Sequence, residues 1–275
     1  MKIFFIVLVI GCLYACHKKI IGERTTFFPK QVKVADEIPL KQNVWVFIMA
    51  GQSNMAGRAL VEPQDTIADK RILSINKEGR LIIAKEPLHF YEPNLTGLDC
   101  GLSFAKRLLK NVPGNISILL IPTAVGGSAI SQWLGDSVYR SVQLFSNFTS
   151  KVNDAKQYGI IKGILWHQGE SDANEKNSPK YEERLTNLIY KFRLVAANNN
   201  LPVLIGELGT FSKTKQQFSL INDAIHHYAS QHENVSVIST GDLKDKGDSL
   251  HFNSAAQRAM GKRFAEAYIK TYTTQ

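Results

Sequence analysis

Cysteine is scarce in this sequence: there are three in 275 residues, and two of them, Cys12 and Cys16, fall within the first 16 positions. The rest of the chain keeps Cys100 and at most Cys16, so no internal disulfide framework can form. Nothing in the sequence around Cys100 looks like an activating base, which disfavours a catalytic thiol. We therefore expect Cys100 to lie in a packed interior, near the start of a helix.

Long runs of basic residues are also missing. The formal net charge is +9 and the sequence pI is near 9.4, but Lys and Arg are scattered, with only short groupings such as Lys18–Lys19 and the pair Lys244 and Lys246. Binding to nucleic acid or to a membrane surface through charge requires that the charge be clustered. We therefore interpret the positive charge as a solvated surface and expect no nucleic-acid partner.

Internal repeats and low-complexity segments are absent as well. The chain is 44% hydrophobic and 21% charged, values that are ordinary for a globular protein. Its length suits one large α/β domain or two small ones and can bury a substantial core. With no break in composition along the body of the chain, we expect one domain.

The first residues have the pattern of an export signal. Met1–Lys2 gives a positive start, and Ile3–Ala15 is an uncharged apolar run that is short for a membrane anchor. Its two cysteines each follow a small residue, which resembles the lipobox of bacterial lipoproteins. Cys16 is the favoured lipidation site and Cys12 the alternative; a plain secretory signal with incidental cysteines is the other interpretation. Either one places the protein outside the cytoplasm, and a lipobox would make it a membrane-anchored lipoprotein, periplasmic or on the cell surface.

After the signal at 1–16, residues 17–43 are polar and contain Pro29 and Pro39, which is typical of a tether. The folded domain is then expected over residues 44–275. Apolar runs and helical patterns alternate within it, which predicts right-handed crossovers and a mostly parallel sheet between layers of helices. Strands are expected over 44–50, 115–121, 160–166, 202–208 and 235–239, and helices over 99–110, 138–158, 178–197, 215–231 and 254–272. The stretch 59–98 is irregular, with one expected hairpin formed by 71–75 and 81–83.

The first candidate for a reactive side chain is Ser53. The apolar run Val44–Ala50 stops at a glycine, and Gln52-Ser53-Asn54 follows it. Open α/β folds bind their ligands at the carboxyl edge of the sheet, so a serine on this turn is a candidate nucleophile. A serine there can also cap a helix, and this stretch alone favours the cap.

Two later loops follow expected strands and carry further candidates. The first contains Gly126-Gly127, where the backbone can approach a ligand and direct an N–H at the negative oxygen of a tetrahedral intermediate. The second reads WHQGESD, in which Gln168 can donate its side-chain amide and Glu170 and Asp172 are acidic. A glycine pair alone is usually only a turn, and His167 alone is more often structural than a base. One histidine among scattered carboxylates is weak support for a metal, so none is expected.

A third loop precedes the closing helix and contains Asp248 three residues before His251. The carboxylate can accept a hydrogen bond from one imidazole nitrogen and so fix the tautomer, leaving the other nitrogen free to take the proton of a serine hydroxyl. The alternative is a helix-capping turn in which these two side chains pair only with each other. Taken singly, the two interpretations are balanced.

The four loops fall together on one edge of the expected sheet, and at this point the sequence resembles the SGNH hydrolases. It is most similar to the branch that contains acetylxylan esterases of carbohydrate esterase family 6 and the sialate O-acetylesterase domain. The resemblance runs from about Val44 to about Tyr268 and rests on the combination GQSNMAGR, GGS followed by W, WHQGESD and DSLHF. The wider family has Asn at its third motif position, where this chain has Gln168, which is similar to the variant of this branch.

The resemblance implies an SGNH or flavodoxin-like fold, a three-layer α/β/α sandwich with a central, mostly parallel sheet of about five strands, and no metal or other cofactor. It implies that Ser53 is the nucleophile, that His251 is the general base and that Asp248 orients the imidazole. The implied oxyanion hole consists of the backbone N–H groups of Ser53 and Gly127 and the side chain of Gln168. Supporting or substrate-binding positions would be Gln52, Asn54, Arg58 and Glu170, whereas the role of Trp133 stays open.

The implied function is that of a serine esterase, acetylxylan esterase-like, which removes O-acetyl groups from carbohydrates through an acyl-enzyme. A sialate O-acetylesterase is the alternative within the family. A non-catalytic glycan-binding lipoprotein would have lost Ser53 or His251, and both are present. A lipase or thioesterase would need an apolar acyl channel, which only the irregular 59–98 stretch could hide, and a structural or adhesive lipoprotein would not need the four loops. We expect substrate specificity to lie in 59–98 and around 131–139.

Overall fold

The computed structural model describes residues 24–273. The expected signal with Cys12 and Cys16, and the first part of the expected tether, lie outside the described residues. No helix within 24–273 combines the length and hydrophobicity needed to cross a membrane.

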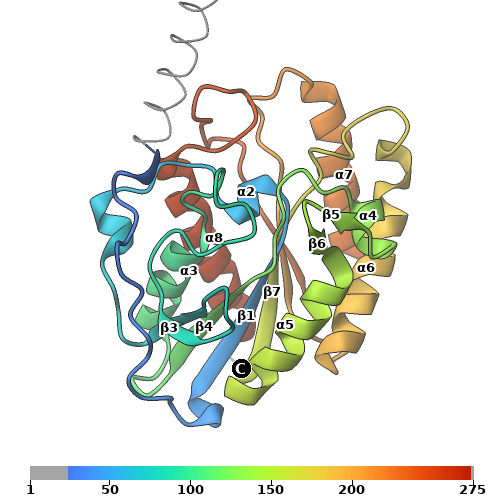
Figure 1. Ribbon diagram of the computed structural model, residues 1–275. Helices are drawn as coiled ribbons and strands as arrows, with labels where there is room; N and C mark the ends of the chain where they lie inside the picture. The colour runs from blue at the N-terminus through green and yellow to red at the C-terminus, as the bar shows by residue number, and fades with distance from the viewer. Residues whose placement is uncertain (1–23, 274–275) are drawn as a thin grey trace, which may run out of the picture.

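A seven-stranded sheet forms the centre of the molecule, in the order β3-β2-β4-β1-β7-β8-β9 (Figure 1). All neighbouring strands are parallel except β2 and β3, which pair as the expected antiparallel hairpin. The strands are β1 (Val44–Gly51), β2 (Ile72–Ile75), β3 (Leu81–Ile83), β4 (Ser117–Pro122), β7 (Ile160–His167), β8 (Val203–Gly206) and β9 (Val235–Ile238). The α/β class with a mostly parallel sheet is confirmed.

The strand count exceeds the expected number of about five because the hairpin β2–β3 joins the sheet. Strand β2 pairs with β4 through Ile72, Leu73 and Ser74. Ile72 and Leu73 are both buried although they point to opposite faces, so the hairpin is covered by the core on both sides. Arg71 secures the start of β2 by donating from Nε to the carbonyl oxygen of Ile116, at 2.8 Å.

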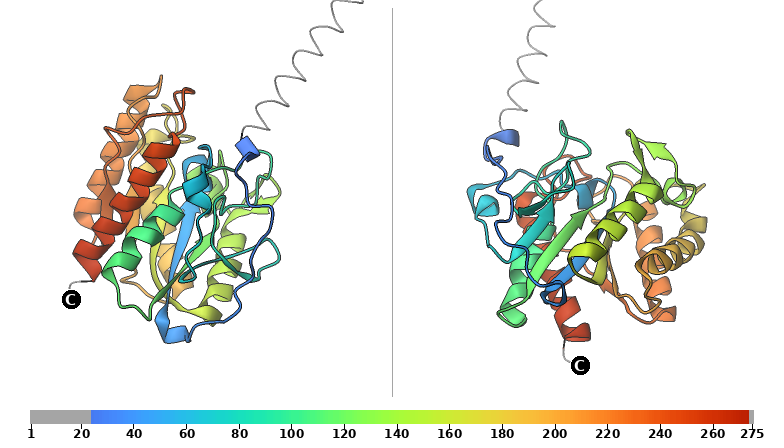
Figure 2. Two further views of the ribbon diagram at one scale, coloured as in Figure 1. Left: turned by 90° about the vertical axis from the view of Figure 1, so that its left-hand side faces the viewer. Right: turned by 60° about the horizontal axis from the view of Figure 1, so that its bottom comes forward.

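Helices cover both faces of the sheet (Figures 1 and 2). They are α2 (Ser53–Ala56), α3 (Gly101–Leu108), α4 (Ile130–Leu134), α5 (Leu144–Tyr158), α6 (Tyr181–Ala196), α7 (Lys215–Gln231) and α8 (Ser254–Tyr272). Side chains of α3 and α8 share one hydrophobic cluster with Phe47 and Met49, whereas those of α5, α6 and α7 share the other with Val46 and Ile48. Alternate side chains of β1 thus pack into the clusters on opposite faces of the sheet, because successive side chains of a strand point to opposite faces.

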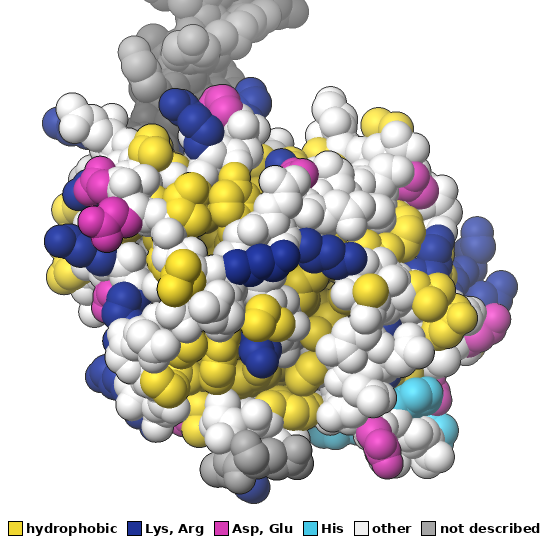
Figure 3. Space-filling model, turned by 90° about the horizontal axis from the view of Figure 1, so that it is seen from below, with side chains coloured by type: hydrophobic (Ala, Val, Ile, Leu, Met, Phe, Trp, Pro, Cys, Tyr) yellow, Lys and Arg dark blue, Asp and Glu magenta, His cyan; other side chains and the backbone are white. Residues whose placement is uncertain are grey.

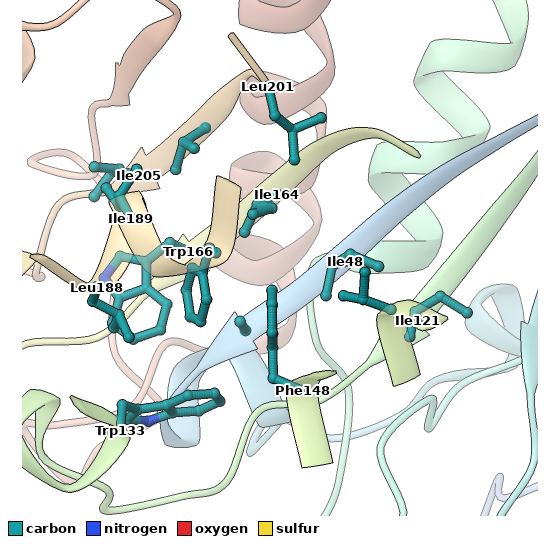
Figure 4. Close-up of a cluster of buried hydrophobic side chains, with 14 of the residues drawn as sticks. Ile48, Ile121, Trp133, Phe148, Ile164, Trp166, Leu188, Ile189, Leu201 and Ile205 are labelled. Atoms are coloured by element: carbon teal, nitrogen blue, oxygen red, sulfur yellow. The ribbon is translucent and has the colours of Figure 1, made fainter. Parts of the chain in front are cut away.

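Aromatic side chains pack among aliphatic ones in the cluster under α5 and α6 (Figure 4). Trp133 and Trp166 meet edge to face with their ring centroids 5.6 Å apart, and Phe148 stacks on Phe192 at 4.0 Å. All four side chains are fully buried. Trp133, whose role the sequence left open, is therefore a core residue; its Nε1 donates to Ser128 Oγ at 2.9 Å.

The expected helix over 138–158 is wrong at its start. Residues Val138–Tyr139 and Val142–Gln143 form a two-stranded hairpin, β5–β6, and the helix α5 begins only at Leu144. The turn between the two strands holds Arg140 and Ser141 at φ 47° and 64°, a conformation that interrupts a helix. This hairpin and the short helix α4 just before it were not predicted.

The described part of the expected tether packs on the domain. Residue Val34 bridges to Ile82 in β3, and the N–H of Ala35 donates to the carbonyl oxygen of Leu81 at 3.1 Å. The guanidinium of Arg24 donates to the carbonyl oxygen of Thr96 at 2.6 Å. Residues Arg24, Val34 and Ala35 of the expected tether thus contact the domain.

The end of the molecule opposite the loops that follow the strands is seen in Figure 3. Apolar side chains gather near its middle, with Lys and Arg side chains spread between and around them. Basic groups on this face are thus dispersed and do not form one continuous patch.

Candidate active site

The carboxyl ends of β1 and β7 lie side by side, and the candidate residues gather there. After β1 the chain passes through α2 and the hairpin β2–β3 to α3 on one face before it returns in β4, whereas after β7 it passes through α6 on the other face, which is the arrangement that opens a crevice in α/β sheets. Gly51 closes β1 at φ 137°, and a Cβ there would lie 2.1 Å from the carbonyl oxygen of His167. Only glycine therefore lets the two strand ends approach and places Ser53 directly at the edge.

Ser53, His251 and Asp248 form a continuous hydrogen-bonded chain. The Oγ atom of Ser53 lies 3.0 Å from Nε2 of His251, and Nδ1 of His251 lies 2.7 Å from Oδ2 of Asp248. The other carboxylate oxygen of Asp248 accepts the backbone N–H groups of Leu250 and His251, at 3.1 and 2.8 Å. These backbone bonds fold the turn so that the second carboxylate oxygen faces the imidazole of the same turn, with the ammonium group of Lys246 at 3.5 Å from it. A histidine held in this way can take the hydroxyl proton of the serine.

The environment keeps Asp248 ionised and His251 neutral. Burial opposes ionisation of Asp248, but the hydrogen bonds from the backbone N–H and imidazole of His251 prevail and lower the pKa of Asp248 to about 2. Burial also lowers the pKa of His251; contact with Asp248 raises it, and the positive charges of Lys246 and Arg58 lower it further, so the pKa of the imidazole lies below its usual value. A neutral imidazole is the form that accepts a proton.

Two loops that line the pocket in front of Ser53 each carry a backbone N–H group that has no partner among the described residues. Within residues 24–273 the N–H groups of Ser53 and Gly127 have no hydrogen-bond acceptor. Gly127 has φ 82°, and a Cβ on it would lie 2.9 Å from the hydroxyl of Tyr139, so the turn requires glycine. The preceding N–H, that of Gly126, donates to Oε2 of Glu92 at 2.6 Å and fixes the loop. Two such donors beside a nucleophilic serine can stabilise an oxyanion.

The side chain of Gln168 does not take the position that the resemblance implied. It is fully buried, and its Nε2 lies 2.7 Å from Oδ2 of Asp172, 3.1 Å from the carbonyl oxygen of Ser128 and 3.1 Å from Oε1 of Gln52. An amide nitrogen carries only two hydrogens, so these acceptors use both of them. Gln168 also does not line the pocket at Ser53. In this structure the side-chain amide of Gln168 is thus bonded to other acceptors and does not face Ser53, where the resemblance would place it.

Asn54 joins the serine turn to the histidine loop. Its Oδ1 accepts the backbone N–H of Phe252 at 3.1 Å, and its Nδ2 donates to the carbonyl oxygen of Leu250 at 3.1 Å. These two backbone groups flank His251. The same Nδ2 donates to Oε1 of Glu170 at 2.6 Å. Asn54 therefore positions the imidazole against Ser53, and Glu170 braces Asn54.

The pocket in front of Ser53 has a volume of about 500 Å³. Its cationic side chains are those of Arg24, Arg58, Arg140 and Lys246, and it is also lined by Gln52, Ser53, Asn94, Leu95, Gly126, Gly127, Glu170, Ser171, Asp248, Leu250 and His251. Arg58 pairs with the buried Glu92 at 2.7 Å, and Arg140 pairs with the same carboxylate. Within residues 24–273 no group of three or more His, Cys, Asp or Glu side chains is placed to hold a metal ion.

Several pocket residues were missed from the sequence. Asn94 and Leu95 come from the irregular 59–98 stretch, and Arg140 comes from the hairpin that was expected to be helical. The 59–98 stretch also supplies Glu92, which does not line the pocket but pairs with two of its arginines. Both stretches were named as the place of specificity, but their periodicity gave no signal for individual side chains. Nothing in the sequence marked Arg140, because the residue falls inside the stretch that was expected to be helical.

Comparison with known proteins adds independent findings. Residues 43–270 match the model of a family described as carbohydrate esterase, sialic acid-specific acetylesterase. A protein of Arabidopsis thaliana named as a probable carbohydrate esterase is 26% identical over 266 residues, which are 89% of this chain and 97% of the relative. Its solved structure superposes with a TM-score of 0.74 and covers 83% of this chain and 98% of that one.

Two further solved structures share the fold. The structure of NanS is 19% identical, with a TM-score of 0.69, and the match covers 86% of this chain and 100% of that one. A carbohydrate acetylesterase from Xanthomonas citri is 20% identical, with a TM-score of 0.64, and the match covers 85% of this chain and 57% of that one. At these identities the likeness establishes the α/β architecture.

Proposed function

Because the chain belongs to the carbohydrate esterase family described as sialic acid-specific acetylesterase, we propose that it is a serine esterase which removes O-acetyl groups from carbohydrates. The observation that carries the proposal is the chain of contacts from Ser53 Oγ to His251 and from His251 to Asp248, at 3.0 and 2.7 Å. A non-catalytic glycan-binding protein would have no need to keep all three groups within hydrogen-bond distance.

In the proposed mechanism Ser53 Oγ attacks the acetyl carbonyl carbon while Nε2 of His251 accepts the hydroxyl proton. The carbonyl oxygen becomes an oxyanion, to which the N–H groups of Ser53 and Gly127 donate. Collapse of the intermediate expels the sugar oxygen, which takes the proton from His251 and leaves acetyl-Ser53. Water then attacks the acetyl carbonyl while His251 takes its proton, and His251 passes this proton to Ser53 Oγ as acetate leaves.

The charge of the pocket favours an acidic sugar, and so the sialate O-acetylesterase, over neutral acetylated xylan. Arg24 lines the pocket, and among the described residues its guanidinium bonds only to the carbonyl oxygens of Thr96 and Pro93, with no carboxylate partner. Arg58 and Arg140 share the single carboxylate of Glu92. A substrate carboxylate would therefore meet cations that are not fully compensated.

Acetate release by the purified domain from three substrates tests the proposal: O-acetyl sialic acid, acetylated xylan and a short synthetic acetyl ester. We expect the highest kcat/KM on the sialic acid. Arg24→Met should raise KM for that substrate about tenfold, as the loss of one charged contact predicts, and leave the uncharged synthetic ester unaffected. Preference for xylan would replace the sialate assignment, and no release from any of the three would favour a binding protein.

The pH dependence of kcat/KM should report the pKa of His251, because the free enzyme must have a neutral imidazole. Activity is expected to fall as pH drops through this pKa, which lies below the usual value for histidine. Since the positive charge of Lys246 lowers the pKa of His251, Lys246→Met should move the acid limb to higher pH by less than about one unit. Lys262→Met on α8 is the control for net charge, and an acid limb that stays in place in the Lys246 variant would contradict this role.

A further inference from the structure

The side chain of Gln52 is oriented in a way that the sequence did not indicate. Its Oε1 receives Nε2 of Gln168 at 3.1 Å, the backbone N–H of Ser171 at 3.2 Å and that of Gly169 at 3.5 Å. A backbone N–H can only donate, so the atom that faces Ser171 and Gly169 must be the amide oxygen. The amide nitrogen of Gln52 is therefore fixed on the opposite side.

That nitrogen is directed to the pocket. Gln52 is only 3% exposed, and it lines the pocket next to Ser53 and Gly127. In the described part of the chain its Nε2 has no hydrogen-bond partner. Every other polar group of the residue has one: Oε1 accepts the bonds given above, and the backbone N–H donates to the carbonyl oxygen of His167. The backbone carbonyl oxygen accepts the N–H groups of Met55 and Ala56. The nitrogen atom itself is reached by solvent from the pocket, so a bound ligand can accept its hydrogens there.

We infer that the Gln52 side-chain amide, and not that of Gln168, is the third donor to the oxyanion, and that Gln168 positions it. The inference rests on the proposed function. Gln168 holds Gln52 by donating to its oxygen, and Gln168 is itself held by Asp172, whose Oδ2 also accepts the N–H of Ile130 at 2.8 Å. A donor restrained in this way needs no reorganisation when the negative charge develops, which is the condition for strong oxyanion stabilisation.

The substitution Gln52→Glu separates a catalytic donor from a structural acceptor. It keeps an oxygen for Gln168, Ser171 and Gly169 but removes the amide hydrogens from the pocket side. We expect kcat on the synthetic acetyl ester to fall about 10²- to 10³-fold, as for loss of one oxyanion donor, with KM changed less than about threefold. The loss should persist at the pH plateau, so that a shift in the pKa of His251 does not account for it.

Two comparison variants isolate the effect. Gln52→Met introduces no charge and should lose kcat to a similar extent, together with some thermal stability, because three donors lose their acceptor. Gln132→Glu is the matched control: Gln132 lies outside the pocket, and its Oε1 likewise accepts one backbone N–H, that of Ala129, at 2.8 Å. Its kcat should equal that of the wild type.

The outcomes are distinct. A Gln52→Glu variant with the wild-type kcat would show that Gln52 is only an acceptor and would overturn the inference, as would full activity of Gln52→Met. Neither result would affect the requirement for Ser53. Acetate release by Ser53→Ala at a rate near that of the wild type, in contrast, would overturn the proposed function and the inference together.

Discussion

Ser53→Ala is expected to lower kcat for acetate release by about 10⁴-fold or more while leaving the fold intact. Among the described residues Ser53 carries the one hydroxyl within hydrogen-bond distance of Nε2 of His251. Without it the imidazole has no nucleophile to deprotonate, and the two backbone N–H groups can only polarise the ester for attack by water. The hydroxyl makes one hydrogen bond at the edge of an open pocket, so the free energy of unfolding should change by about 1 kcal/mol or less.

Ser171→Ala is the matched control for this prediction. Ser171 lines the same pocket, but its Oγ donates to the carbonyl oxygen of Gly127 at 3.0 Å and does not contact the imidazole. We expect a loss of kcat below about tenfold, from a looser Gly127 turn. If the two serine variants lose activity equally, the assignment of the nucleophile to Ser53 is wrong.

The strand and helix pattern of this chain was predictable because its core is regular. The β1 run Val44–Gly51 is apolar on both faces, as in a buried parallel strand, and the helices that follow have polar outer faces. The hairpin β5–β6 was not predictable, since its turn depends on residues at positive φ that no periodicity marks. The number of strands in the sheet was underestimated because nothing in the sequence predicts that β2 pairs with β4.

The site was predictable where the reactive side chains lie in a single turn of the backbone. Asp248 and His251 lie three residues apart, so one turn fixes their geometry, and the serine lies at the end of the central strand. The role of Gln168 was not predictable, because it depends on Asp172 and Gln52 competing for its amide. Glu92 was missed for a similar reason: its partners Arg58 and Arg140 are distant in sequence, and only the tertiary structure joins them.

Position within the fold thus explains why neighbouring polar residues differ in role. Gln52, Ser53 and Asn54 are consecutive, yet their side chains differ in role. Gln52 lines the pocket with a restrained amide, and Ser53 faces the imidazole. Asn54 bonds to the backbone on both sides of His251. The turn after β1 therefore supplies the reacting group and the means of aligning its base. Three neighbouring residues can have separate roles here because the ends of β1 and β7 fix the backbone of the turn.

Asp248→Asn should reduce kcat about 10³- to 10⁴-fold, through the tautomer of His251 and not through loss of position. The backbone N–H groups of Leu250 and His251 bind one oxygen of Asp248, and in the variant they would still select the amide oxygen. The amide nitrogen would then face Nδ1 of His251 and donate to it. Nδ1 becomes an acceptor, the proton moves to Nε2, and the imidazole can no longer take the proton of Ser53.

Asp248→Ala tests this explanation, because it removes the carboxylate without imposing the wrong tautomer. We expect it to be at least as active as Asp248→Asn, and nitrogen-15 spectra of the neutral histidine ring should show Nε2 fully protonated in the asparagine variant but a mixture of the two tautomers in the alanine variant. A wild-type rate in Asp248→Asn would transfer the orienting role to another carboxylate. The structure leaves little scope for that, since Glu170 is bound to Asn54 and Asp172 to Gln168 and Ile130. Such a rate would therefore mean that the Asp248–His251 contact is not part of the working geometry.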